Sequence, residues 1–147
     1  MKSFLNKFLL ITILSSVAIL FANCKDENNP SSPPGHDSDL VGMWELEEVY
    51  VPVADSTVYP QDLGFALTAD FMADGKYEIT ETETGSMPSV ETGTWSTANG
   101  SLTLTNDSDG EKEIIPYTVN GNVGILKVNY EVQPGLTVPA EFKFMKK

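Results

Sequence analysis

Apolar and polar residues alternate with a period of two along most of the chain after residue 40. Such alternation is typical of β-strands that bury one face, and Thr, Val and aromatic residues are common in these segments. After the N-terminal leader, only the connection 52–63 leaves room for a helix. The pattern predicts eight strands, at about residues 41–51, 64–73, 76–84, 89–98, 101–106, 111–119, 123–132 and 138–146.

The connections between these strands differ at the two ends of the predicted sheet. At one end they match two-residue hairpin turns: Asp74-Gly75, Asn99-Gly100 and Asn120-Gly121. At the other end they are longer: residues 52–63, 85–88, 107–110 and 133–137. This asymmetry predicts an all-β fold, a single eight-stranded antiparallel up-and-down barrel with a closed floor and an open mouth. Side chains fill such an interior, or it holds one small ligand.

The inward-facing positions of this barrel follow from the same alternation. They are mostly aliphatic or aromatic, so they can form one hydrophobic core without help from a disulfide. The predicted interior consists of Trp44, Leu46, Phe65, Leu67, Phe71, Tyr77, Ile79, Trp95, Leu102, Leu104, Tyr117, Leu126, Val128, Phe142 and Phe144.

The first 23 residues resemble a lipoprotein signal peptide. Lys2 and Lys7 accompany an apolar run, residues 8–21, that is shorter than the ~20 residues of a membrane-spanning helix. Residues 20–24 (Leu-Phe-Ala-Asn-Cys) then resemble a lipobox, where a signal peptidase cuts before a lipid-modified cysteine, although Phe and Asn are unusual at their positions. We expect acylation of Cys24, the only cysteine. The alternative is an ordinary cleaved signal peptide followed by a stray cysteine.

The residues after Cys24 indicate a tether and a destination. Residues 25–39 contain no large apolar residue, which predicts a disordered tether (24–39) ahead of a folded domain (40–147). Lys25, Asp26 and Glu27 resemble the short signal that sends lipoproteins of some Gram-negative bacteria to the outside of the outer membrane. We expect a lipid-anchored outer-membrane protein exposed on the cell surface. The alternative is that these three residues are only part of a solvated tether.

The chain is strongly acidic. Its formal charge is −12, and loss of residues 1–23, which contain two lysines and no acidic residue, would change this to −14. A negative field repels phosphate groups, so we exclude nucleic acid as a partner. The simpler use of the same charge is to keep an exported protein soluble.

Two short motifs resemble lipocalin-like domains of bacterial lipoproteins. Residues 42–44 (Gly-Met-Trp) are similar to the Gly-x-Trp opening of lipocalins, and residues 93–95 (Gly-Thr-Trp), followed by 99–104, are similar to the middle of the bacterial domains. The resemblance implies a lipocalin-like barrel over residues 40–147, with the connection 52–63 as a lid over its mouth.

One departure from the lipocalin pattern concerns the last strand. Lipocalins usually place an arginine there, over the tryptophan of the first strand, and this chain has no arginine. A lysine could cover Trp44 by a cation–π contact instead, the candidates being Lys143, Lys146 and Lys147.

Groups for catalysis are scarce. His36 is the only histidine and lies in the predicted tether, which argues against nucleophilic triads and against zinc sites built on His or Cys. We therefore expect no enzymatic activity and no cofactor, although paired carboxylates leave a glycosidase as an alternative. Residues 106–111 partly resemble a calcium-binding loop, but a hairpin turn explains their Asp and Gly residues equally well.

The inward alternation becomes acidic toward the predicted mouth. If it continues without interruption, it brings mainly glutamates into the upper part of the cup, where they would favour a cationic guest. The candidate ligand-binding residues are Glu48, Tyr50, Phe65, Glu81, Glu83, Glu91, Glu111, Glu113 and Tyr130. The alternative is that β-bulges turn these side chains outward to solvent.

Together these features predict a membrane-anchored binding protein. Its barrel would hold a small cationic or amphipathic ligand, or would contact a neighbouring outer-membrane protein through its mouth. The alternative is an outer-membrane lipoprotein with a structural or interaction role and no ligand.

Overall fold

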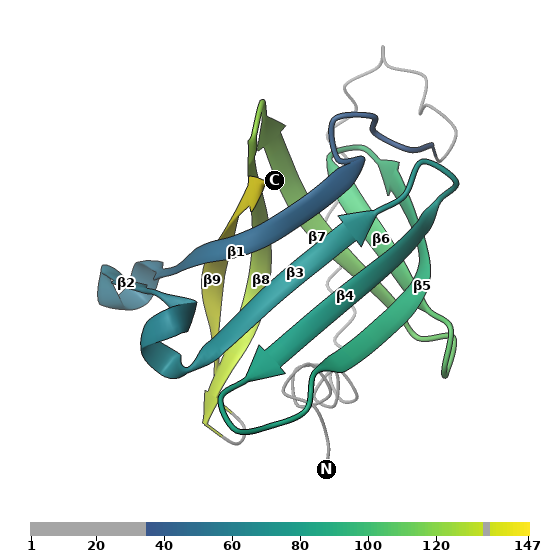
Figure 1. Ribbon diagram of the computed structural model, residues 1–147. Coiled ribbons are helices and arrows are strands. Elements are labelled where there is room, and N and C mark those ends of the chain that lie inside the picture. The colour runs from purple at the N-terminus through teal and green to yellow at the C-terminus, as the bar shows by residue number, and fades with distance from the viewer. Residues whose placement is uncertain (1–34, 134–135) are drawn as a thin grey trace, which may run out of the picture.

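The computed structural model describes residues 35–133 and 136–147, with side chains except at 130–136, as an antiparallel barrel (Figure 1). In chain order its elements are β1 (Gly42–Val51), the 3-10 turn η1 (Pro52–Ala54), β2 (Ser56–Val58), the 3-10 turn η2 (Pro60–Leu63), β3 (Phe65–Phe71), β4 (Lys76–Glu83), β5 (Ser89–Ala98), β6 (Ser101–Asn106), β7 (Lys112–Asn120), β8 (Val123–Gln133) and β9 (Leu136–Lys146). The eight predicted strands are therefore confirmed, with one short strand, β2, added between the first two.

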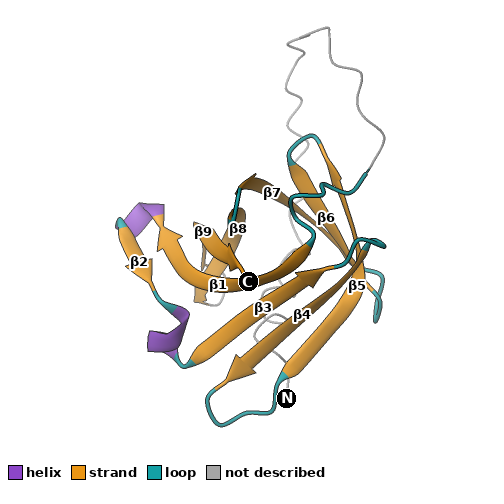
Figure 2. Ribbon diagram, turned by 45° about the horizontal axis from the view of Figure 1, so that its top comes forward, coloured by secondary structure: helices purple, strands orange, loops and turns teal. Residues whose placement is uncertain are grey.

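Consecutive strands are neighbours, and the barrel closes because β1 also pairs with β9. Trp44 lies opposite Lys146, and Tyr50 lies opposite Glu141 in this closing ladder. β1 pairs with β3 through residues 42–45 only, and β2 takes over that side of β1 at residues 49–51. Figure 2 shows the resulting ring of strands, with β2 and the two 3-10 turns projecting from one end. The predicted all-β, eight-stranded up-and-down barrel is confirmed.

Three short turns form one end of the barrel, here named the closed end. Only the turn at 99–100 matches the prediction of two central residues with positive φ: Asn99 has φ 52° and Gly100 has φ 72°. The turn after β3 is longer, and only Gly75 is left-handed, whereas the turn after β7 uses residues 121–122, one position later than predicted.

The opposite end, here named the open end, contains the connections 52–64, 84–88 and 107–111. The predicted loop 133–137 is wrong, because β8 extends to Gln133 and β9 starts at Leu136. In the first connection, η1 and η2 each begin at a proline, Pro52 and Pro60, whose fixed φ suits the first position of a helical turn.

The core lies toward the closed end and contains the residues that the alternation predicts. Trp44 and Tyr77 are at most 2% exposed and Leu102 is fully buried, while the Phe71 and Trp95 rings meet edge to face at 5.4 Å. Phe65, Tyr117, Leu126, Val128 and Phe142 are half-buried and pack against this core. The buried set also includes residues outside the predicted list: Leu40, Val49, Ala69, Ile115 and Ala140.

Residues 35–40 cover the closed end, although the sequence places 35–39 in the tether. Gly35 pairs with Thr97, and the His36 ring lies 4.7 Å from the Trp95 ring with Nε2 2.9 Å from the Trp95 carbonyl oxygen. The Tyr117 hydroxyl donates to Asp37 Oδ2 at 2.8 Å. These contacts satisfy polar groups beside the core, so the folded part begins earlier than predicted.

Trp44 joins this cover to the barrel. Its Nε1–H donates to the Leu40 carbonyl oxygen at 2.7 Å, and the Lys146 ammonium lies 5.2 Å from its ring centroid. Of the three lysines suggested as substitutes for the missing arginine, Lys146 therefore makes the cation–π contact.

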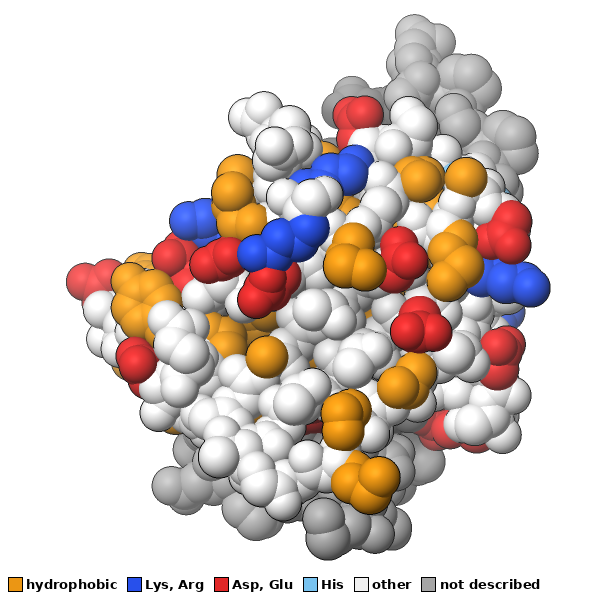
Figure 3. All heavy atoms as spheres, in the orientation of Figure 1, with side chains coloured by type: hydrophobic (Ala, Val, Ile, Leu, Met, Phe, Trp, Pro, Cys, Tyr) orange, Lys and Arg blue, Asp and Glu red, His pale blue; other side chains and the backbone are white. Residues whose placement is uncertain are grey.

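Ion pairs support the closing ladder on its outer face. Lys143 pairs with Glu48 at 3.0 Å, and Lys147 pairs with Glu45 and Glu47. Figure 3 shows acidic and basic side chains gathered over this part of the barrel.

The predictions for the signal peptide (1–23), Cys24 and the Lys25-Asp26-Glu27 signal fall outside the described residues. Among residues 35–133 and 136–147, no helix has the length and apolar character needed to span a bilayer.

Candidate functional site

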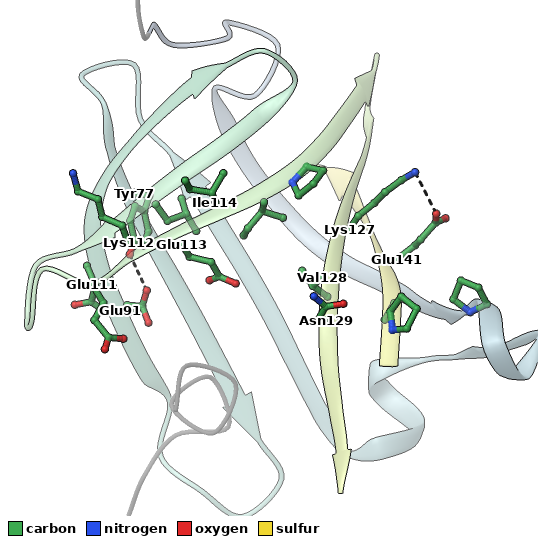
Figure 4. Close-up of a pocket in the computed structure, with 17 residues that line it drawn as sticks. Tyr77, Glu91, Glu111, Lys112, Glu113, Ile114, Lys127, Val128, Asn129 and Glu141 are labelled. Atoms are coloured by element: carbon green, nitrogen blue, oxygen red, sulfur yellow. Dashed lines mark hydrogen bonds and ion pairs between the residues drawn. The ribbon is translucent and has the colours of Figure 1, made fainter. Parts of the chain in front are cut away.

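A cavity of about 660 Å³ occupies the barrel toward the open end (Figure 4). Its inner wall is apolar and aromatic, formed by Tyr77, Leu104, Ile115, Val128 and Ala140 from five different strands. Pockets for small ligands typically measure about 300–1,000 Å³ and combine such walls with a few polar groups. The interior is therefore large enough to hold a small molecule.

The cavity opens sideways through a slit between β7 and β8. These strands are paired only where residues 117–120 meet residues 123–126, and no pairs join 112–116 to 127–129. We name residues 112–116 and 127–129 the lips of the slit. Lip residues that point outward, Lys112, Ile114, Lys127 and Asn129 among them, line the same cavity as the inner wall.

Pro116 gives the physical reason for the slit. The Tyr117 N–H donates to the Gly100 carbonyl oxygen at 3.0 Å, so the backbone groups of Tyr117 face β6. Backbone groups of alternate residues face opposite neighbours, so those of Pro116 face β8. Pro116 has no N–H to give to Lys127, which would be its partner in a continued register, and the ladder ends there.

Three of the predicted glutamates lie together on one wall. Glu91 on β5, Glu113 on β7, and Glu111 just before β7 line the cavity, as Figure 4 shows. The Tyr77 hydroxyl donates to Glu91 Oε1 at 2.7 Å and so fixes this carboxylate at the inner end of the group. Two lysines also line the cavity, but Lys127 pairs with Glu141 at 3.7 Å. Among the described side chains of the lining, these three carboxylates are then accompanied by one lysine without that partner, Lys112.

Burial and charge affect the ionisation of this wall. Desolvation, with a further contribution from the Glu91 charge, raises the pKa of Glu113. Glu113 is accessible to solvent, yet protein surrounds its carboxyl group on most sides, because the group lies inside an open cavity. Burial and the hydrogen bond to Glu91 raise the pKa of Tyr77 above its usual value, so its hydroxyl stays a donor.

Glu48 and Tyr50 do not enter the cup, contrary to the prediction. The β1–β9 register shifts between Leu46 and Glu48, which leaves Glu47 outside the ladder. This irregularity reverses the alternation, so Val49 is buried and Glu48 meets Lys143 on the outer face. The Tyr50 hydroxyl donates to Asp55 Oδ1 at 2.9 Å in the open-end connection.

Three other predicted site residues, Glu81, Glu83 and Phe65, do not line the cavity. Glu81 is 5% exposed and follows Tyr77 and Ile79 on the inner face of β4, while Glu83 and Phe65 are half-buried and opposite each other at the end of the β3–β4 ladder. Tyr130 pairs with Val138, and its side chain lies outside the described residues. Of the glutamates predicted to enter the cup, Glu91, Glu111 and Glu113 therefore line the cavity, and they do so on one wall.

Sequence reasoning missed the lips of the slit. Lys127, Asn129 and Ile114 sit at outward positions, where alternation assigns them to the surface. One signal was available, since Pro116 interrupts an otherwise regular strand, and a proline in a strand marks an edge or a break in the ladder.

The calcium-like loop behaves as a hairpin connection. Asn106 Oδ1 accepts from the Ser108 backbone at 2.7 Å, and Asp109 Oδ1 accepts from the Glu111 N–H at 2.9 Å. Within the described part of the chain, no three His, Cys, Asp or Glu side chains are grouped so that they could hold a metal ion.

The fold and the cavity define a class: a small antiparallel β-barrel with an accessible interior. The sequence profile of the lipocalin-like domain family matches residues 40–123, more than half of the chain, and the protein belongs to this family. The structure of a lipocalin-like protein from Bacteroides uniformis is similar, with a TM-score of 0.52 and 13% sequence identity over 75% of this chain and 100% of that one. At this identity the likeness shows the fold alone. Comparison with curated proteins gives no significant match.

Proposed function

We propose that this protein is a lipid-anchored binding protein of the outer membrane that holds a small amphipathic cation in its barrel. The observation that carries the proposal is the cavity of about 660 Å³, whose wall combines buried aromatic and aliphatic side chains with three glutamates. Eight-stranded barrels are wide enough to hold one small ligand, as in lipocalins.

The charges of the cavity support a cationic guest. Lys127 is paired with Glu141. Among the other described side chains that line the cavity, Glu91, Glu111 and Glu113 carry three negative charges and Lys112 one positive charge, a net charge of −2. Desolvation first, and repulsion by the Glu91 charge second, raise the pKa of Glu113, and an ammonium group would offset both effects. An apolar body attached to that group would fit against Leu104 and Ile115, and an anion of the same shape would be rejected.

The direction of the tether supports access to the cavity from outside. Gly35 pairs with Thr97 beside the turn at 99–100, and His36 lies against Gly75 in the turn after β3. The chain therefore enters the barrel at the closed end. An anchor at Cys24 would hold that end toward the membrane and leave the open end facing away from it.

A second candidate function is contact with a neighbouring outer-membrane protein. It rests on large apolar side chains exposed in the open-end connections: Val53 is 68% exposed, Leu63 60% and Met87 91%. Such residues, when they gather, mark contact surfaces. Cross-linking to neighbouring proteins in intact cells tests this role separately from ligand binding. Met87→Asp, which replaces one of these exposed apolar side chains by a charge, is the variant compared with the unmodified chain.

The binding proposal is tested with dansylcadaverine, a fluorescent probe with an aromatic body and a primary ammonium group. We expect the fluorescence of the probe to rise and saturate as it binds. Its affinity should be about ten-fold or more lower for Glu91→Gln/Glu113→Gln, since charge-assisted contacts are strong when partly desolvated. Glu48→Gln, on the outer face, is the matched control and should bind as the unmodified chain does. Equal affinities for all three proteins would contradict a role for the acidic wall.

The anchoring proposal has its own test. Cells that make the protein are labelled with a fatty-acid analogue, and we expect label on the unmodified chain and none on Cys24→Ser, which should leave the membrane fraction. If Lys25, Asp26 and Glu27 direct export to the surface, external protease should degrade the protein in intact cells, and replacement of the three by alanine should protect it. An unlabelled unmodified chain would refute the lipoprotein assignment.

A further inference from the structure

We propose that ligands enter and leave this barrel sideways, through the slit between β7 and β8, and not through the open end alone. The proposal rests on the binding function proposed above and adds the route by which the cavity is reached. It concerns the lips of the slit, residues 112–116 and 127–129.

Side chains from both faces of β7 and β8 line the cavity. In a continuous ladder, inward and outward residues of a strand are separated by the sheet itself. Here the outward residues Ile114 and Asn129 line the same cavity as the inward residues Ile115 and Val128. The space therefore passes between the two strands and reaches the outer surface of the barrel.

The backbone of the two lips is not joined by ladder pairs. The groups of Lys112, Ile114 and Pro116 that face β8, and those of Lys127 and Asn129 that face β7, make no β7–β8 ladder pairs. The lips can separate further without breaking a ladder hydrogen bond. On the other side of β8, by contrast, pairs with β9 continue from Val123 to Gln133, so a route there would break the ladder.

Pro116 lies where the β7–β8 ladder ends. Because its missing N–H faces β8, Pro116 removes a hydrogen bond that would continue the ordinary strand register across the slit. Closer to the turn, Tyr117 and Leu126 restore the ladder and hold the two strands at a fixed hinge. The lips are therefore free at one end and fixed at the other, which suits a passage that widens and narrows.

The lips also match an amphipathic guest. Ile114, 68% exposed, and Pro116 give one lip an apolar outer edge, and Glu113 lies just inside that edge. A guest that passes between the strands meets apolar contacts first and the carboxylates next.

The test closes the slit and measures rates. The protein is the chain from residue 24 onward with Cys24→Ser, so that introduced cysteines are the only ones. Continued register would place Ile114 opposite Asn129, and Ile114→Cys/Asn129→Cys can then be joined by oxidation across the slit. The matched control is Thr103→Cys/Ile114→Cys, which joins the same lip residue to β6, where the two positions are already paired.

Stopped-flow association and dissociation of dansylcadaverine is the readout. Each pair is compared with its own reduced form, so that the two substitutions are the same on both sides of the comparison. We expect oxidation across the slit to slow both rates by about ten-fold or more, with affinities of the oxidised and reduced forms that agree within about two-fold, because a closed passage hinders both directions equally. Reduction should restore both rates, and the control should show neither effect. Ile114→Trp, which narrows the slit without a covalent bond, should slow both rates as well.

The outcomes separate the two proposals. If the unmodified chain binds the probe and neither Ile114→Trp nor a joined pair slows it, ligands use the open end and the slit is not the route. If the two thiols fail to join, Ile114→Trp alone decides, and unchanged rates overturn the proposal. If the unmodified chain takes up no probe, the binding function is wrong, and the proposed route is refuted with it.

Discussion

The two ends of the barrel use the same strands in opposite ways. At the closed end, short turns join fully paired strands, Trp44 and Tyr77 are almost completely buried, and residues 35–40 cover the core. At the open end, the β1–β9 ladder contains a register shift, the β7–β8 ladder stops at Tyr117, and a cavity of about 660 Å³ reaches the surface. The closed end stabilises the fold, and the open end is left free for a site.

The difference between the two ends depends on a few positions at which regular strand pairing is interrupted. Pro116 ends one ladder, and the irregularity at Glu47 removes Glu48 from the interior of another strand. Neither change disturbs the aromatic packing near the turns, because each lies toward the open end of its strand. The two halves should therefore respond very differently to substitution.

The largest effect is expected at Trp44. Its side chain is 2% exposed, its Nε1–H is bonded to Leu40, and Lys146 lies over its ring, so Trp44→Ala should lower the free energy of unfolding by about 3–5 kcal/mol. At the slit, Ile114→Ala should change it by about 0.5 kcal/mol or less. Urea unfolding of both variants measures the contrast, and equal losses would mean that the two halves share one uniform core.

A smaller but sizeable loss is expected at Gly93. A Cβ at this position would collide with the Thr105 carbonyl oxygen and approach the Tyr77 ring to 2.6 Å. Gly93→Ala should therefore lower the free energy of unfolding by about 1–3 kcal/mol through overpacking. Thr94→Ala, at the exposed neighbouring position, is the control. A neutral result for Gly93→Ala on thermal unfolding would place the Tyr77 ring elsewhere.

The cover of the closed end can be probed at Tyr117. Tyr117→Phe removes the hydrogen bond to Asp37 and should lower the free energy of unfolding by about 1 kcal/mol. Burial first, and the neighbouring Asp37 second, raise the pKa of Tyr117 to about 12 from 10.0. The folded state thus favours the neutral phenol.

The pH dependence of that variant has a definite sign. Tyr117 should make its full contribution to the free energy of unfolding below pH 10. This contribution should fall between pH 10 and about 12, because the unfolded chain releases the phenolic proton first. Denaturant unfolding of wild type and Tyr117→Phe at pH 8 and pH 11 compares the two conditions. A difference between the proteins that grows with pH would contradict the assignment.

The smallest effect is expected at Glu113 and has the opposite sign. Because desolvation and the Glu91 charge raise its pKa, the folded state disfavours the charged carboxylate. Glu113→Gln should raise the free energy of unfolding at pH 7 by about 0.5 kcal/mol or less, and the gain should vanish below pH 4.5. Thermal unfolding at both pH values is the measurement. A loss of stability at pH 7 would show that Glu113 is stabilised by a partner.

The sequence predicts the closed end better than the open end. Alternation locates Trp44, Tyr77 and Leu102 correctly, because the face of each strand that carries the large apolar side chains must turn toward the core. Asn99-Gly100 is also predicted correctly, because both residues accept positive φ.

The open end is less predictable because it depends on departures from regular pairing. A single register shift places Glu48 on the outer face, and no residue near it in the sequence indicates that shift. Glu91, Glu111 and Glu113 are found by extending the alternation backwards along β5 and β7, where the strands are regular. The slit arises because the backbone of Pro116 faces β8. The residue pattern along one strand does not reveal which neighbouring strand a given backbone group faces.

A ligand should bind in the open end of the barrel and not at the closed end. Two-dimensional amide NMR during titration with dansylcadaverine tests it directly, since each strand residue except proline reports separately. We expect shifts at Glu91, Glu113, Ile115 and Val128, with residues 74–75 and 99–100 of the closed end unchanged. Shifts centred on the closed end or on the outer face around Lys143, or no shifts at all, would contradict it.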